Sequence, residues 1–249
     1  MNLLKTVILS ATLLAAFTPR TTRAGAAPLE WISLSNIRPG QMTIGVAEAR
    51  IRAAGLQAMT EQERREYLEE HPISIALGPK GRVHLVDGHH LSYALIELES
   101  RGVMPAKAPA KTLGDLSESS ESDFWKTMQK RDWVYLFDEK DAPINSGDLP
   151  QRVKGLRDDR QRSLAWLLRE EGCYQHIERP FQEFVWAKFL RKLVPVPNNQ
   201  AESFRSALLA AKKLAHDPKS SQIPGYKKTH NQQGHGEISA KNERRISTL

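Results

Sequence analysis

Residues 71–102 carry the pattern that most restricts how this chain can fold. Apolar residues alternate with others over 73–77, a Gly-Pro-Lys-Gly segment follows at 78–81, and apolar residues return over 83–86. Alternation with a period of two is typical of a strand, and Pro followed two positions later by Gly favours a type I turn. The segment therefore predicts a β-hairpin.

Asp87-Gly88-His89-His90 follows the hairpin, and an apolar pattern of helical period then runs as far as Gly102. Gly88 allows a sharp turn of the backbone or the close approach of a ligand. The first N–H groups of a helix lack partners within it and carry a partial positive charge, which suits an anion. Imidazoles and a carboxylate can transfer protons or bind a cation there. The pattern indicates a site for negatively charged oxygen atoms.

Structural explanations for the same residues stay open. Asp87 can serve only to cap the helix, because Asp-Gly turns are common. His89 and His90 cannot both face one point from a regular helix, so one of them can be a packing residue. Two adjacent histidines and an aspartate do not have a spacing that specifies a metal site. The metal is therefore left unknown, with a divalent cation as an option.

Strand and helix patterns are mixed along the rest of the chain, which predicts an α+β fold. The strand-like patterns lie at 31–37, 106–113 and 133–137. The helical patterns lie at 43–54, 60–70, 122–131, 161–171 and 180–192, with a last one from 199 onward. We expect a core over residues 29–116 and a mainly helical lobe over 117–215 packed on that core.

The positive charge lies at the two ends of the chain. Of the formal net charge of +7, Lys5, Arg20 and Arg23 supply three charges and residues 219–249 supply four, so residues 25–218 sum to zero. A neutral body gives no whole-domain argument for binding a nucleic acid duplex. Residues 216–249 are rich in His, Gln, Gly, Ser and Lys, and we expect a disordered basic tail.

Residues 1–24 have the features of a secretory signal peptide. Lys5 precedes an apolar run over 7–17, and small residues precede a cleavage position after Ala24. An uncleaved anchor is the alternative, but the apolar run is shorter than the ~20 residues that span a bilayer. We expect a periplasmic or secreted protein with no transmembrane span after cleavage.

Four segments together point to a family. They are Ile37-Arg38-Pro39-x-Gln41-x-x-x-Gly45, His71-Pro72-Ile73, Val86-Asp87-Gly88-His89-His90 and Asp158-Asp159-x-x-Arg162-Ser163-Leu164-Ala165-Trp166. With them, about residues 30–195 resemble the ParB-like nuclease family of the ParB/sulfiredoxin superfamily. The resemblance implies a small mixed sheet with flanking helices. It also implies a phosphate pocket lined by Asp87, Gly88, His89 and His90, with Gln41 opposite.

Two residues outside the loop bear on this pocket. Arg162 and Trp166 lie four apart on one helix face, so the guanidinium can stack on the indole or reach the cleft. We count Arg162 among the phosphate-binding candidates, with a structural cap and a core Trp as the alternative. Leu91 stands where many relatives have Arg, which removes a bidentate phosphate clamp. The loop has no cysteine, which excludes sulfiredoxin chemistry, and Cys173 is expected to be a buried packing thiol.

The residues and the resemblance together leave three functions open. The first is an exported nuclease or phosphodiesterase in which Asp87, His89 and His90 are catalytic, acting on nucleic acid. The second is a noncatalytic module that binds a nucleotide or another phosphorylated small molecule at the same helix terminus. The third is a ParB-like small-molecule kinase, which the predicted export disfavours because ATP is scarce outside the cytoplasm.

Overall fold

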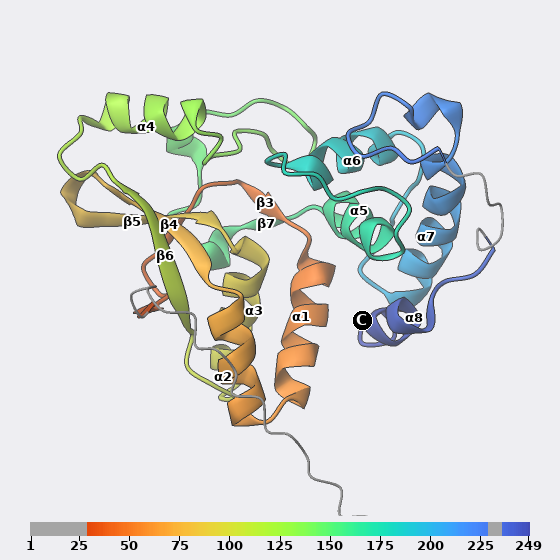
Figure 1. The fold of residues 1–249 in the computed structure, drawn as a ribbon, viewed down its shortest axis with the longest axis horizontal. Coiled ribbons are helices and arrows are strands. Elements are labelled where there is room, and N and C mark those ends of the chain that lie inside the picture. Colours follow the sequence, from red (N-terminus) through yellow and green to blue (C-terminus); the bar gives the residue numbers. More distant parts are fainter. Residues whose placement is uncertain (1–28, 229–235) are drawn as a thin grey trace, which may run out of the picture.

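The structure, a computed structural model, describes residues 29–228 and 236–249 and has the expected α+β fold (Figure 1). Its strands are β1 (Glu30–Ser33), β2 (Arg38–Pro39), β3 (Thr43–Ile44), β4 (Ile73–Gly78), β5 (Arg82–Asp87), β6 (Lys107–Asp115) and β7 (Arg157–Asp158). Its helices are α1 (Val46–Ala58), α2 (Glu61–Glu70), α3 (His89–Ser100), α4 (Glu121–Lys130), α5 (Arg160–Glu170), α6 (Gln182–Arg191), α7 (Ala201–Ala215) and α8 (Ala240–Ile246).

A mixed sheet of five strands forms the centre of the core, in the order β1-β6-β4-β5-β2. β4 pairs antiparallel with β5 and parallel with β6, while β2 pairs parallel with β5. β3 and β7 form a separate parallel pair. The small mixed sheet implied by the resemblance is therefore confirmed.

The predicted hairpin is present, but its turn differs from the expected one. β4 and β5 are joined by residues 79–81, and Lys80 and Gly81 have φ values of 62° and 67°. A type I turn requires negative φ at its central positions. A short connection with positive φ instead matches the right-handed twist of the two strands.

Helices cover both faces of the sheet. Ile73 and Ile75 of β4 lie in the core cluster that includes α1 and α3, whereas Ala76 packs with Phe124 and Met128 of α4. Successive side chains of a strand point to opposite faces, so α4 lies across the sheet from α1 and α3. By packing, α4 thus belongs with the core sheet, although it falls within residues 117–215, and the mainly helical part begins at α5.

The strand predicted over residues 133–137 does not form. Tyr135 makes an isolated bridge to Gln41, and Phe137 makes one to Pro143. The N–H group of Tyr135 donates to the carbonyl of Gly40 at 2.8 Å. The neighbouring segment around Gly40 supplies one pairing position rather than a strand edge, so these β-preferring residues are used for packing instead.

The helical lobe has its own core and is joined to the sheet through α1 and α5. Trp186 of α6 and Phe204 of α7 are fully buried in a cluster that also takes in Ala47 and Ile51 of α1. Asp159 caps α5, accepting from the N–H groups of residues 161 and 162. α1 and α5 therefore fix how the two halves sit against each other.

The expectation of a disordered tail over residues 216–249 is wrong for the part that the structure describes. α8 forms there, and Ile246 is fully buried against the helical lobe. Glu171 accepts hydrogen bonds from Ser239 and Asn242. Composition alone missed these contacts because a few apolar side chains and specific acceptors are enough to order a short helix. Residues 229–235 lie outside the described residues, so disorder stays a prediction there.

The predicted signal peptide over residues 1–24 also lies outside the described residues. Within 29–228 and 236–249, no helix is long and apolar enough to cross a membrane.

Candidate functional site

The site is built around the start of α3. β5 ends at Asp87, and Gly88, with φ of 92°, turns the chain into the helix. A Cβ on Gly88 would lie 2.6 Å from Cγ2 of Ile73, so neither the backbone angle nor the space admits a side chain. The helical hydrogen bonds begin with the N–H of Ser92 donating to the carbonyl of Gly88. The preceding amides of the first turn lack partners within the helix and suit an anion.

His89 and His90 hold another loop against this helix. Nε2 of His89 accepts from the N–H of Gly40, and Nε2 of His90 accepts from the N–H of Gly45, each at 3.0 Å. Both side chains are buried, and they reach two different amides rather than one point. The rings therefore tie the segment over residues 40–45 to the start of α3.

Both imidazoles are neutral at neutral pH. Burial lowers the pKa of His89 to about 4, although Asp87 acts in the opposite direction. Burial also lowers the pKa of His90 well below 6.5. The backbone of Leu85 also opposes the lowering of the pKa of His89. Nδ1 of His90 hydrogen-bonds no described residue and is the donor that this ring can offer.

Glu48 of α1 lies beneath His90 and was not predicted as a site residue. Its carboxylate is 1% exposed and accepts from Nη2 of Arg52 at 2.8 Å and from Nη1 of Arg162 at 2.9 Å. Burial alone would raise the pKa of Glu48, but the guanidinium groups of Arg162 and Arg52 beside it hold that pKa below its usual range. Glu48 is therefore ionised, and it fixes the two guanidinium groups.

Arg162, predicted from the sequence, does reach the cleft. Besides the bond to Glu48, its Nη2 lies 3.8 Å from the carboxylate of Glu183, and its guanidinium lies over the ring of Phe184. Its buried Nε has no hydrogen-bond partner among the described residues. The alternative stacking on Trp166 is made instead by Arg52 and Arg245.

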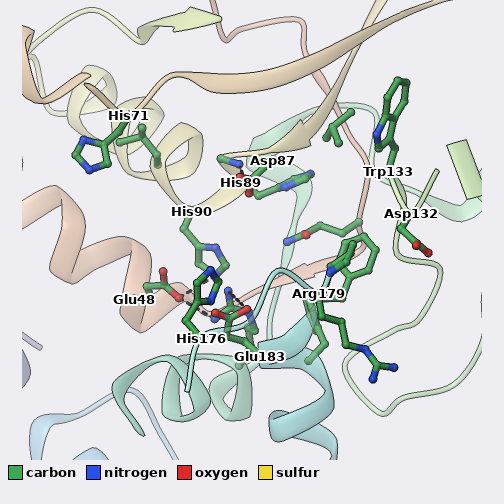
Figure 2. Close-up of a pocket in the computed structure, with 18 of the residues that line it drawn as sticks. Glu48, His71, Asp87, His89, His90, Asp132, Trp133, His176, Arg179 and Glu183 are labelled. Atoms are coloured by element: carbon green, nitrogen blue, oxygen red, sulfur yellow. Dashed lines mark hydrogen bonds and ion pairs between the residues drawn. The ribbon is translucent and has the colours of Figure 1, made fainter. Parts of the chain in front are cut away.

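These side chains line a cavity of about 600 Å³ (Figure 2). In Figure 2, Glu48, His90, His176 and Glu183 gather on one side of the cavity, with Asp132 and Trp133 on the other. All six predicted site residues line it: Gln41, Asp87, Gly88, His89, His90 and Arg162. Gln41 is buried and donates to the carbonyl of Thr43, whereas Asp87 is exposed at the opening.

Arginine is the prevailing cation around this cavity. Five arginines line it: Arg52, Arg131, Arg162, Arg169 and Arg179. Arg169 is hydrogen-bonded to Glu183, and Arg131 lies over the ring of Trp133. Arg179 is exposed, and its guanidinium has no partner among the described residues. Guanidinium groups bind the oxygens of phosphate and carboxylate groups well, so the cavity suits an oxyanion.

Most of the residues that line the cavity were not predicted from the sequence. Arg162 and Arg169 are seven residues apart and share a face of α5, and this spacing could have indicated from the sequence that both reach the cleft. Glu48 and Arg52 are four residues apart on α1, and this spacing could have indicated an ion pair between them. His176 and Arg179 lie in the loop before α6, where no periodic pattern marks them.

The donor set around the cavity does not form a protein cage for a metal ion. Within the described residues, no group of three or more His, Cys, Asp or Glu side chains is arranged to hold one. Asp87 is the exposed carboxylate beside the first turn of α3. Because a hard cation such as Mg²⁺ commonly binds one carboxylate together with substrate phosphate oxygens, Asp87 is the residue that fits such a cation.

Cys173 is a packing residue, as expected. Its thiol is buried, and burial raises its pKa to about 11. The thiol is therefore protonated at neutral pH and is not a nucleophile.

The part of the chain that forms this cleft matches the sequence model of a known protein family. Residues 31–192 match the family described as "Putative ParB-like nuclease". The chain belongs to this family. The matched range runs from β1 to the end of α6 and contains every residue named above as lining the cleft.

A solved structure is similar to this chain in both fold and sequence. The crystal structure of protein Atu1540 from Agrobacterium tumefaciens is similar, with a TM-score of 0.69 and 32% sequence identity. The similarity covers 80% of this chain and 97% of that one. No match was found among curated proteins.

Proposed function

We propose that this ParB-like protein cleaves phosphodiester bonds in nucleic acid, with the phosphate bound in the cleft at the start of α3. The observation that carries the proposal is the convergence of the first turn of α3 and five arginines on one cavity of about 600 Å³. Helix amides and guanidinium groups are the donors that proteins commonly use for phosphate.

The arginines have different roles in this proposal. Glu48 and Glu183 hold Arg52, Arg162 and Arg169 in place through ion pairs, so these cations are preorganised. Arg179 has no such partner among the described residues and is exposed, so it contacts the substrate phosphate. Preorganised donors stabilise charge that develops in a transition state without reorganising.

The proton-transfer roles differ from those expected from the sequence. His89 is buried and its Nε2 is engaged by the N–H of Gly40, which makes it a positioning residue. His90 positions the loop at Gly45 and offers Nδ1–H to the phosphate. Asp87 and His176 are exposed at the cavity and act as general base and general acid. Oδ1 of Asp87 accepts from the N–H of Gly88 at 2.7 Å, so Oδ2 is the oxygen that takes the proton.

An assay of cleavage with single- and double-stranded DNA and RNA, each with and without Mg²⁺, Mn²⁺ or Zn²⁺, tests this function. We expect Asp87→Asn to lower kcat by about 100-fold or more, because general acid–base catalysis contributes at least that much. Arg179→Ala should raise KM about tenfold, since one charge-assisted contact is lost. Arg244→Ala, which removes an exposed arginine of α8 outside the cleft, is the matched control. Full cleavage by the Asp87→Asn variant would contradict the assigned role.

A noncatalytic binding module is the second candidate. It is favoured by the hydrogen bonds that Nε2 of both His89 and His90 accepts from backbone amides, because a lone pair engaged in this way is not available to take a proton from a substrate. On this alternative, nucleotides would raise the melting temperature, Arg179→Ala would abolish that shift, and no nucleic acid would be cut under any metal condition.

We also propose that the protein is exported. The support is the apolar run over residues 7–17 followed by small residues up to Ala24. Cell fractionation with amino-terminal sequencing tests it, and we expect a mature chain beginning at Gly25 outside the cytoplasm. A cytoplasmic chain that retains residues 1–24 would refute export and revive the kinase alternative.

A further inference from the structure

A second cavity adjoins the arginine-lined cleft. It has a volume of about 380 Å³ and is lined mainly by apolar and aromatic side chains. Four residues line both cavities: Asp132, Arg179, Pro180 and Phe181. The two cavities are therefore neighbouring parts of one surface depression, one charged and one aromatic.

An aromatic cluster runs between the two cavities. The ring of Tyr135 lies 4.2 Å from that of Phe184 in the cleft, 5.0 Å from that of Phe181 and 5.1 Å from that of Phe137. Tyr135, Phe137 and Phe181 line the second cavity and are half-buried, so part of each ring stays accessible. We call these three residues the aromatic groove.

The boundary between the cavities is held in an unfavourable backbone conformation. Asp132 has φ of 52° and Phe181 has φ of 59°. Positive φ is rare for residues other than glycine, and a bulky residue there is strained. Strain of this kind persists where the surrounding structure enforces it and is concentrated at binding sites. Phe181, held in this conformation, lies at the junction of the groove and the cleft.

The charges near the aromatic groove suit the backbone of a nucleic acid. The ammonium of Lys188 lies 5.9 Å from the centre of the Phe137 ring, and Arg179 is free of partners among the described residues. Asp132 is the carboxylate at the boundary, and it can accept a hydrogen bond from the exocyclic amine of a base. Aromatic platforms next to cationic grooves are how proteins bind unpaired bases and their phosphates.

We propose that the substrate is single-stranded nucleic acid, with one phosphate in the cleft and a neighbouring base stacked on the aromatic groove. This inference rests on the proposed function and specifies its substrate class. In a duplex the faces of the bases are stacked on one another and are closed to protein rings. Residues 25–218 also carry no net charge, so the body has no general attraction for a duplex.

Fluorescence anisotropy with the purified protein tests the groove separately from the phosphate site. The probes are a labelled ten-residue oligothymidylate, a ten-residue backbone of the same length without bases, an oligoadenylate RNA and a ten-base-pair duplex. We expect the two base-bearing single strands to bind about tenfold more tightly than the abasic backbone, since stacking one base contributes about that factor.

Variants assign the preference to the aromatic groove. Phe137→Ala should weaken oligothymidylate binding about tenfold while leaving the abasic backbone unchanged. Phe137→Leu keeps most of the apolar volume and so controls for folding, and it should also lose most of the preference. Trp31→Ala removes an exposed aromatic residue far from both cavities and should change nothing.

The outcomes separate this inference from the proposed function. Equal binding of the oligothymidylate and the abasic backbone, with no effect of either Phe137 variant, would overturn the aromatic groove while leaving the phosphate site intact. Tighter binding of the duplex than of either single strand would overturn it as well. Absence of binding to all four probes would overturn the proposed function itself.

Discussion

Replacing Glu48 by glutamine should lower the free energy of unfolding by about 3–5 kcal/mol, the cost of removing one partner from a buried ion pair. The carboxylate is 1% exposed and is the shared acceptor of Arg52 and Arg162. Glutamine keeps the shape but removes the charge, so the buried guanidinium of Arg162 loses its strongest partner. Urea unfolding followed by circular dichroism at pH 7 measures the effect.

Glu69→Gln is the matched control for Glu48→Gln. Glu69 also accepts from an arginine, Arg65, four residues away on a helix, but both side chains are largely exposed. Exposed pairs of this kind contribute about 0.5 kcal/mol. A loss of similar size in both variants would show that burial of Glu48 does not make its ion pairs important for stability.

Gly88→Ala should destabilise the protein by about 3 kcal/mol, from a left-handed backbone penalty of about 1–2 kcal/mol and an overpacking cost of similar size. With φ of 92° at Gly88, the added methyl group would lie 2.6 Å from Cγ2 of Ile73. Relief of that contact requires the start of α3 to move away from β4, which also displaces the amides proposed to bind phosphate. Urea unfolding measures the stability loss.

Gly81→Ala separates the two contributions to that loss. Gly81 also has positive φ, 67°, but a Cβ there would meet nothing within 4 Å. Gly81→Ala should lower the free energy of unfolding by about 1 kcal/mol, from the backbone conformation alone. Equal losses at Gly81 and Gly88 would mean that Ile73 yields freely and that Gly88 is required only for its backbone angle.

The cleft depends on contacts that cross the fold. Asp158 accepts from the N–H of Val46 at the start of α1, and Ser163 accepts from the N–H of Glu48. These bonds join α1 to β7 and α5, so that Glu48 and Arg162 meet. The histidines of the loop then attach the segment over residues 40–45 to α3. The site is thus held together by backbone amides and buried polar groups rather than by one local motif.

The predictions from sequence succeeded where the determining interactions are local. The hairpin over 73–87 formed, and so did the helices predicted over 60–70 and 161–171. Each depends on hydrogen bonds or alternation within a few residues, which a short window of sequence contains. The strand predicted over 133–137 failed because a strand needs a partner edge, and the segment around Gly40 supplies only one pairing position.

The roles of the site residues could be predicted less well than their positions. The six predicted residues do line one cavity, but the two histidines were expected to be free for chemistry. Their ring nitrogens bind the amides of Gly40 and Gly45, which are 49 and 45 residues away. Nothing near the loop indicates that those amides would lie there.

The amino-acid sequence by itself determined the hairpin, the sharp turn at Gly88 and the start of α3, because each is carried by consecutive residues. It also determined the ParB-like family, which four short segments between Ile37 and Trp166 carry together. The tertiary structure alone decided which charges meet: Glu48 and Arg162 are 114 residues apart, and the loop before α6 brings His176 and Arg179 to the same cavity. The physical reason is that electrostatic pairing depends on distance in space and on burial, and both are set only when the helical lobe packs on the sheet.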